Sequence, residues 1–343
     1  MTSCADLRAL FCAAAGARRG YGHLVRSLSF ARALGVRPLI AVRGTQQARD
    51  VALGLGADVV AAHATRAIRA LRPDVVVVDD PSTPHSQRRI DAARRVGALV
   101  VTIHDLGLGC AEGDVVIDGS AASPVSARPG RVSLVGTKFA ILGEQYSRPR
   151  GPVGRALSGS PGGPHKARPT ILKKRQVLIA LGGGPHVKTA EAIARAIVAA
   201  DPRARVRIAG GFVARPRKVA PRVTWVAPRR GLAPELAGAD VAVVGGGVSL
   251  YEACAMGVPA VALPVVGGQV PTVRAFAKRG AAIGLDRVGF DGGAGVRAAA
   301  AQAVALLNSP HQRAALARRS TRLVDGQGAS RAAAAVAALS QGN

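Results

Sequence analysis

A glycine-rich segment near the start of the sequence is the first pattern that could carry chemistry. Residues 16–26 read Gly-Ala-Arg-Arg-Gly-Tyr-Gly-His-Leu-Val-Arg, with an apolar run over 7–15 before them and an amphipathic run over 24–34 overlapping their end. This order predicts a strand, a loop and a helix. The N-terminus of such a helix presents unpaired N–H groups and a positive dipole end at the strand's carboxyl end, where anionic ligands bind.

Within this segment we predict that Gly20 and Gly22 bind a phosphate. His23, at the mouth of the helix, is the candidate general base, because an imidazole takes up a proton near neutral pH. Its alternative role is to cap or pack at the helix start. Arg26, one turn further on, can pair with a phosphate or with an internal carboxylate. The loop is not the dinucleotide fingerprint, because Val25 stands where the third glycine would be.

A second glycine loop occurs within residues 241–259, where an apolar run ends in three glycines and a helical pattern follows. The residues that we predict to bind a diphosphate and its ribose are Gly245, Gly246, Gly247, Ser249 and Glu252. The glycines allow close backbone approach, and the helix start again supplies N–H donors. Glu252 can accept hydrogen bonds from ribose hydroxyls. The alternative is a tight turn, with Glu252 complementing the helix dipole.

Three further positions follow strand patterns and are weaker candidates. Gly183 belongs to a triple glycine that is equally a structural turn. Asp79 ends an apolar run, where a carboxylate can act in catalysis by orienting His23, bind a sugar hydroxyl, or cap the next helix. Gln269 can hydrogen-bond a sugar hydroxyl. We expect neither a metal site nor a cofactor, since positive helix starts can neutralise a diphosphate.

Strand and helix patterns alternate in both halves of the 343-residue chain. Apolar residues make up 48% and aromatic residues 3%, a mix that suits buried parallel strands covered by alanine-rich helices. We therefore predict an α/β protein with two Rossmann-like domains facing a central cleft. The expected boundaries are 1–147 for the acceptor and catalytic domain, 148–170 for a linker rich in Pro, Gly, Ser and Arg, and 171–343 for the nucleotide-sugar domain.

The net charge of +27 suggests a polyanionic partner or a membrane surface. The basic residues are spread along the chain and aromatic residues for base stacking are scarce, so we expect no nucleic-acid partner. Weak peripheral membrane association is compatible with this charge. The four cysteines show no metal or disulfide spacing, which favours the cytoplasm, and no uninterrupted apolar run is long enough to span a membrane.

These motifs resemble those of the GT-B superfamily of nucleotide-sugar enzymes, over roughly residues 7–279. Residues 20–26 are similar to the GxGHxxR motif of the spore-coat-polysaccharide and pseudaminic-acid-pathway group, which includes UDP-sugar hydrolases whose histidine is held to be the base. Residues 136–142 are similar to that group's GxxYALL segment, and residues 245–259 to its donor site. Gln269 falls where the group carries an Asn-Gln pair. MurG-type N-acetylglucosaminyltransferases are more distantly similar.

The chain departs from the hydrolase pattern at two positions. Asp80 follows Asp79 where that group has a tyrosine, and Gly268 replaces the asparagine of the Asn-Gln pair. The resemblance therefore implies, first, a glycosyltransferase that uses a nucleotide-activated sugar, UDP-linked, for cell-surface polysaccharide or glycan synthesis. His23 would deprotonate an acceptor that the sequence does not identify. The alternatives are a UDP-sugar hydrolase, in which His23 activates water, and a non-catalytic nucleotide-sugar-binding protein.

Overall fold

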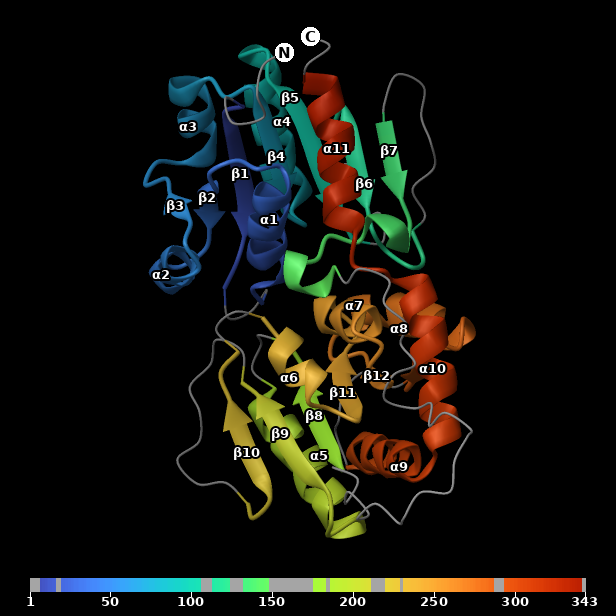
Figure 1. Ribbon diagram of the computed structural model, residues 1–343. Helices are drawn as coiled ribbons and strands as arrows, with labels where there is room; N and C mark the ends of the chain where they lie inside the picture. The colour runs from blue at the N-terminus through green and yellow to red at the C-terminus, as the bar shows by residue number, and fades with distance from the viewer. Residues whose placement is uncertain are drawn as a thin grey trace, which may run out of the picture.

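Two parallel β-sheets organise the molecule. The computed structural model describes residues 7–16, 20–105, 113–123, 132–147, 175–182, 186–210, 220–228, 231–286 and 293–340. Within them, one sheet has seven strands and the other six, and apolar cores lie on both faces of each (Figure 1). The predicted α/β class with two Rossmann-like domains is confirmed.

The first sheet has the order β3-β2-β1-β4-β5-β6-β7, with every pair parallel. Its strands are β1 (Ala9–Ala14), β2 (Leu39–Arg43), β3 (Asp58–Val59), β4 (Val75–Asp79), β5 (Leu99–His104), β6 (Val115–Asp118) and β7 (Val132–Val135). The helices that connect them are α1 (Gly22–Ala33), α2 (Gln46–Gly54), α3 (Ala64–Leu71) and α4 (Thr83–Arg95). Every residue of β1 and β4 is buried, as expected for central strands covered on both faces.

The second sheet has the order β10-β9-β8-β11-β12-β13 and is also parallel. Its strands are β8 (Gln176–Ala180), β9 (Arg205–Ala209), β10 (Val223–Val226), β11 (Val241–Gly245), β12 (Ala260–Leu263) and β13 (Ile283–Gly284). Its helices are α5 (Val187–Ala200), α6 (Ala233–Ala237), α7 (Val248–Ala255), α8 (Val270–Lys278), α9 (Ala294–Asn308) and α10 (Pro310–Leu323). The 15-residue α9 is the longest described helix, and no helix in the described ranges is long and apolar enough to cross a membrane.

The strand order reverses between β1 and β4 in the first sheet and between β8 and β11 in the second. Ligands of open α/β sheets bind at such reversal points, beyond the carboxyl ends of the strands. Here the segments that follow these four strands line one cavity of about 1470 Å³ between the two domains. The fold therefore brings both predicted glycine loops to the same cleft.

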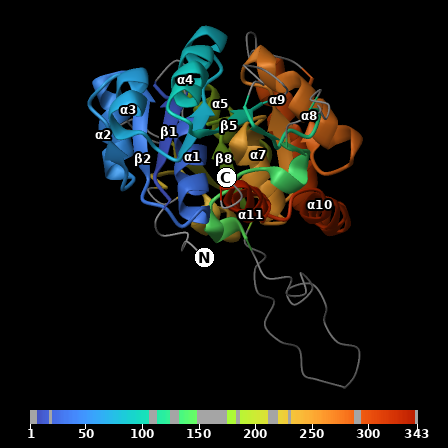
Figure 2. The same cartoon turned by 90° about the horizontal axis from the view of Figure 1, so that it is seen from above.

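The last helix, α11 (Gly328–Ser340), returns to the first domain. It lies beside α1 in both views (Figures 1 and 2), and Ala332 and Val336 are buried in the first domain's core. The expected second domain, 171–343, included α11, whereas the structure packs this helix on the first domain. The apolar face of a helix does not tell from the sequence which of the two sheets the helix covers. The expected linker, 148–170, lies outside the described residues.

Candidate active site

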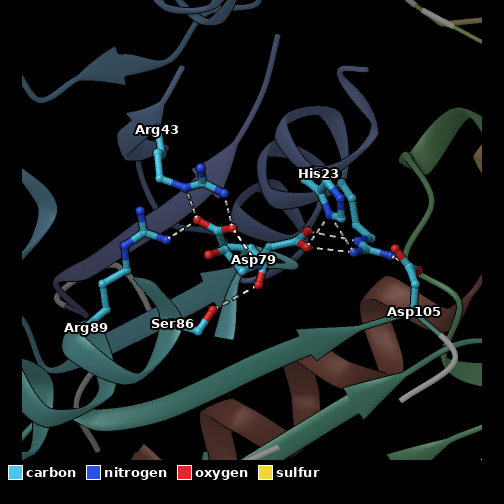
Figure 3. A network of polar contacts seen from close by, with 9 residues as sticks. His23, Arg43, Asp79, Ser86, Arg89 and Asp105 are labelled. Carbon is cyan, nitrogen blue, oxygen red and sulfur yellow. Dashed lines mark hydrogen bonds and ion pairs between the residues drawn. The ribbon is translucent and has the colours of Figure 1, made fainter. Parts of the chain in front are cut away.

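A histidine–aspartate pair stands at the reversal point of the first sheet. Asp79 is the last residue of β4, and His23 lies in the first turn of α1. The His23 Nδ1 atom lies 2.8 Å from Asp79 Oδ1 (Figure 3). A proton on Nδ1 that is donated to the carboxylate leaves Nε2 as the proton acceptor of the ring. The pair therefore has the arrangement of a general base and its orienting acid.

Arg26 holds the carboxylate of this pair from the next turn of α1. Its Nε donates to Asp79 Oδ2 at 2.8 Å and its Nη2 to Asp79 Oδ1 at 2.6 Å. Its Nη1 donates to Asp105 at 2.5 Å, just beyond the end of β5. Of the two partners considered for Arg26, the structure shows internal carboxylates. The predicted phosphate contact would have to compete with two ion pairs.

The ion pairs shift the pKa values of Asp79 and His23 in opposite directions. Burial favours a neutral Asp79, but the charges of Arg26 and His23 outweigh burial and hold the pKa of that carboxyl well below its usual range. Burial would lower the pKa of His23, but the Asp79 carboxylate outweighs it and raises that pKa above its ordinary value. An ionised Asp79 therefore faces a histidine made more basic.

A second set of ion pairs, around Asp80, lies on the other side of the end of β4. The buried carboxylate of Asp80 accepts from Arg43 Nε at 2.6 Å and from Arg89 Nη1 at 2.7 Å (Figure 3). Ser86 Oγ also donates to the Asp80 carbonyl at 2.9 Å. Burial opposes ionisation, yet the two arginines lower the pKa of Asp80 to about 2. The residue where the hydrolase group has a tyrosine is thus part of a structural network.

The two glycine loops approach each other across the cleft. Gly22 begins α1, Val248 begins α7, and a Cβ built on Gly22 would lie 3.7 Å from Val248 Cγ2. Both helix N-termini therefore offer N–H groups to the same space. A Cβ on Gly246 would lie 2.7 Å from Val273 Cγ2 and 2.9 Å from Gln269 Cβ, so a larger residue there would force its neighbours to shift.

Gln269 fixes this second loop. Its Oε1 accepts from Gly246 N at 3.1 Å and from Val265 N at 3.0 Å. The amide oxygen is therefore engaged by the backbone, and only the Nε2 donor is left to meet a ligand in the cleft. The predicted hydrogen bond to a sugar hydroxyl would be donated by Gln269.

Glu252 lies at the inner wall of the cleft, in α7, and is 7% exposed. Burial raises the pKa of its carboxyl to about 7, and a hydrogen bond from the Tyr146 hydroxyl acts in the opposite direction. Tyr146 is the last residue of the short 3₁₀ turn η3 (Glu144–Tyr146), which precedes the second domain. Sequence reasoning missed this residue, because nothing in the local pattern distinguishes it from a linker tyrosine.

Most of the predicted site residues come together in the cleft. The cavity is lined by Gly20, Gly22, His23, Arg26, Gly245, Gly246, Gly247, Ser249, Glu252 and Gln269. Asp79 is buried behind His23. Gly183 lies outside the described residues, although Gly182 lines the cavity. Across the described parts of the chain, no group of three or more His, Cys, Asp or Glu side chains could hold a metal ion.

One stretch of the chain matches a curated protein in sequence. Over 47 residues it is 51% identical to the spore coat polysaccharide biosynthesis protein SpsG of Bacillus subtilis, a match that covers 14% of this chain and 14% of that protein. No protein-family model matches the chain.

Solved structures match over nearly the whole length. The glycosyltransferase VinC in complex with dTDP aligns with a TM-score of 0.61 at 15% identity, over 98% of this chain and 100% of VinC. HepE of Anabaena in complex with UDP-glucose aligns with a TM-score of 0.59 at 11% identity, over 97% of this chain and 100% of HepE. With its seven-stranded and six-stranded parallel sheets facing one cleft, this chain has the GT-B fold.

Proposed function

We propose that this protein is a glycosyltransferase that uses a UDP-linked sugar in the synthesis of a cell-surface polysaccharide or glycan. The observation that carries the proposal is the His23–Asp79 pair, which stands in the same cleft as the glycine loop at the start of α7. A base and an anion-binding helix start in one cleft are the two parts that sugar transfer from a nucleotide needs. The match to SpsG and the nucleotides held by VinC and HepE support the choice of substrate.

In this proposal the second domain binds the nucleotide sugar and the first domain binds the acceptor. Gly245, Gly246, Gly247 and Ser249 bind the diphosphate, and Glu252 binds the ribose. The first domain presents the acceptor, whose hydroxyl proton passes to His23 Nε2 while its oxygen attacks the anomeric carbon. The bond between that carbon and the diphosphate oxygen breaks, and the nucleoside diphosphate leaves with the electron pair. The positive end of α7 stabilises the negative charge of the leaving group.

A second candidate function is hydrolysis of the nucleotide sugar. It is favoured by the motif over residues 20–26 and by Asp79, which would orient His23 toward a water molecule as readily as toward a sugar hydroxyl. The two reactions share the fold, the donor site and the base. They differ in the molecule that occupies the space beside His23.

The test is to measure binding of a panel of UDP-sugars, and release of UDP from them without acceptor, for wild type and His23→Ala. His85→Ala is the matched control, since His85 lies exposed on α4 outside the cleft. We expect saturable binding and slow release in the wild type, then transfer when sugar acceptors are added. His23→Ala should bind but not transfer, and His85→Ala should behave as wild type.

The other outcomes separate the candidates. Rapid release of UDP and free sugar that is lost in His23→Ala would assign the hydrolase. Binding without release or transfer, unchanged in His23→Ala, would assign a non-catalytic nucleotide-sugar-binding protein. Absence of binding to any nucleotide sugar would overturn the proposal.

A further inference from the structure

Helix α7 begins at the second glycine loop and lies at the junction of the two domains (Figure 1). The hydroxyl of Tyr251, in this helix, accepts a hydrogen bond from Ala121 N at 3.1 Å. Ala121 lies just beyond the end of β6 in the first sheet, yet it is buried among the apolar residues of a second-domain core. The hydrogen bond therefore joins the helix of the predicted donor site to the other domain.

The ring and the hydroxyl of Tyr251 contact different domains. The ring packs edge to face on Phe276 of α8, with the ring centroids 4.9 Å apart and the planes at 81°. Because Phe276 is fully buried, this contact holds the ring within the second domain. The hydroxyl extends beyond this packing to the first domain. Removal of the hydroxyl would break the link to Ala121 and leave the ring in place.

The turn after β6 holds the Ala121 N–H group in place from the first-domain side. Asp118, the last residue of β6, is fully buried. Its Oδ1 accepts from Ser120 N at 2.9 Å, and its Oδ2 accepts from Ser123 Oγ at 2.6 Å. An aspartate that accepts hydrogen bonds from residues two and five positions further on fixes the backbone between them. The donor N–H of Ala121 lies within this braced turn.

A second contact joins α7 to the first domain on the same face of the helix. Val248 precedes Tyr251 by three residues, so the two side chains are neighbours on that face. A Cβ built on Gly22 would lie 3.7 Å from Val248 Cγ2, which is ordinary van der Waals contact. Gly22 begins α1 and is followed by His23, the candidate base. The position of α7 against the first domain therefore sets the distance between the second glycine loop and His23.

We infer that Tyr251 is a positioning residue, whose hydrogen bond to Ala121 holds the start of α7 at the separation from His23 that the reaction needs. This inference rests on the proposed function, because it takes His23 as the base and the second glycine loop as the diphosphate site. That loop belongs to the second domain, so nucleotide binding does not need the link. The reaction needs groups of both domains, and a small misplacement of the reacting atoms slows it.

The first measurement is hydrogen exchange of the Ala121 amide, followed by NMR in the full chain without ligand, for wild type and Tyr251→Phe. Phenylalanine keeps the ring on Phe276 and removes the hydroxyl that accepts from Ala121. We expect this amide to exchange about fivefold faster in the variant, because it has lost its hydrogen-bond acceptor. Unchanged exchange would overturn the inference, and the measurement requires neither nucleotide nor acceptor.

The second measurement separates turnover from binding, with the UDP-sugar that binds most tightly to wild type. In Tyr251→Phe we expect the single-turnover rate of UDP release to fall about tenfold, whereas the Kd changes by less than about twofold. Ser123→Ala weakens the turn from the first-domain side, so it should speed exchange of the Ala121 amide and slow turnover to a smaller extent.

Two results of this comparison would overturn the inference. Tyr251 also lines the cavity, so a Kd that rises as much as the rate falls would make it a ligand-binding residue. A rate lowered by Tyr251→Phe and unchanged by Ser123→Ala would assign a direct role to the hydroxyl.

Ser147→Ala is the matched control. The Ser147 hydroxyl donates to Gly326 O at 2.6 Å, between the connection of the domains and the segment that leads to α11. This variant removes a hydroxyl hydrogen bond near the junction without touching α7, so exchange of the Ala121 amide and turnover should match wild type. Equal effects of Ser147→Ala and Tyr251→Phe would indicate general loosening and overturn the inference. Absence of UDP-sugar binding by wild type would contradict the proposed function, and with it the positioning role, whatever the exchange of Ala121 shows.

Discussion

Asp79 and Asp80 are neighbours in the chain, yet their carboxylates belong to two separate arginine networks. Asp79 is held by Arg26 in the cleft, whereas Asp80 is held by Arg43 and Arg89 on the other side of the strand (Figure 3). Consecutive side chains of a strand point to opposite faces, which separates the two networks. The ion pairs of Asp80 therefore hold in place the end of β4, which carries Asp79.

Loss of the Asp80 charge should destabilise the fold. Asp80→Asn leaves Arg43 and Arg89 without their buried counterion, and breaking a buried pair in this way costs about 3–5 kcal/mol. We expect the free energy of unfolding in urea to fall by an amount in this range. Asp286→Asn is the control, because its pair with Arg274 is exposed and should be worth less than ~1 kcal/mol. Equal effects of the two substitutions would contradict the structural role of Asp80.

Loss of the Asp79 charge should act on chemistry more than on binding. Asp79→Asn no longer fixes the Nδ1 proton of His23, so Nε2 is less often free to accept a proton. We expect kcat for turnover of the nucleotide sugar to fall by about 10²–10⁴-fold while the Kd for that sugar changes little. Stopped-time assays paired with calorimetry would measure both quantities. Wild-type turnover in this variant would remove His23–Asp79 from the mechanism.

The pH dependence of activity should follow His23. Asp79 stabilises the imidazolium and raises the pKa of His23 above 6.5, and the reaction needs the neutral ring. The value of kcat/KM should therefore rise with pH through a pKa above 6.5 and level off on the alkaline side. The same limb should move to lower pH in Asp79→Asn if activity remains measurable. An acidic limb at or below pH 6.5 in the wild type would disagree with the raised pKa.

Close packing at the donor loop gives a prediction for Gly246. A methyl group there would lie within 3 Å of both Val273 and Gln269, so the loop must shift and the N–H groups of the helix start move with it. We expect Gly246→Ala to cost about 1–3 kcal/mol of stability and to abolish detectable UDP binding. Gly267→Ala is the control, since a Cβ there meets no atom within 4 Å. Differential scanning fluorimetry with and without UDP would compare the two.

The alternation of apolar runs and helical patterns predicted the two parallel sheets, because buried parallel strands read as apolar runs that end in turn residues. The short strand β7 was not predicted from the sequence. The sequence also placed His23 and Asp79 at one sheet edge, since the ends of parallel strands meet there. It left open the partner of Arg26, because phosphate and carboxylate satisfy a guanidinium equally. The buried state of Glu252 could not be predicted, since it depends on how α7 packs against elements distant in the chain such as α10.

The return of α11 to the first domain has a consequence for the order in which the protein is made. Core residues of the first domain, Ala332 and Val336, come after all of the second domain in the chain. During synthesis, the second sheet and its helices therefore have all their parts before the first domain can close its core. The first domain is therefore the first to be started and the last to be completed. Until α11 has been synthesised, the face of α1 that packs against it stays uncovered.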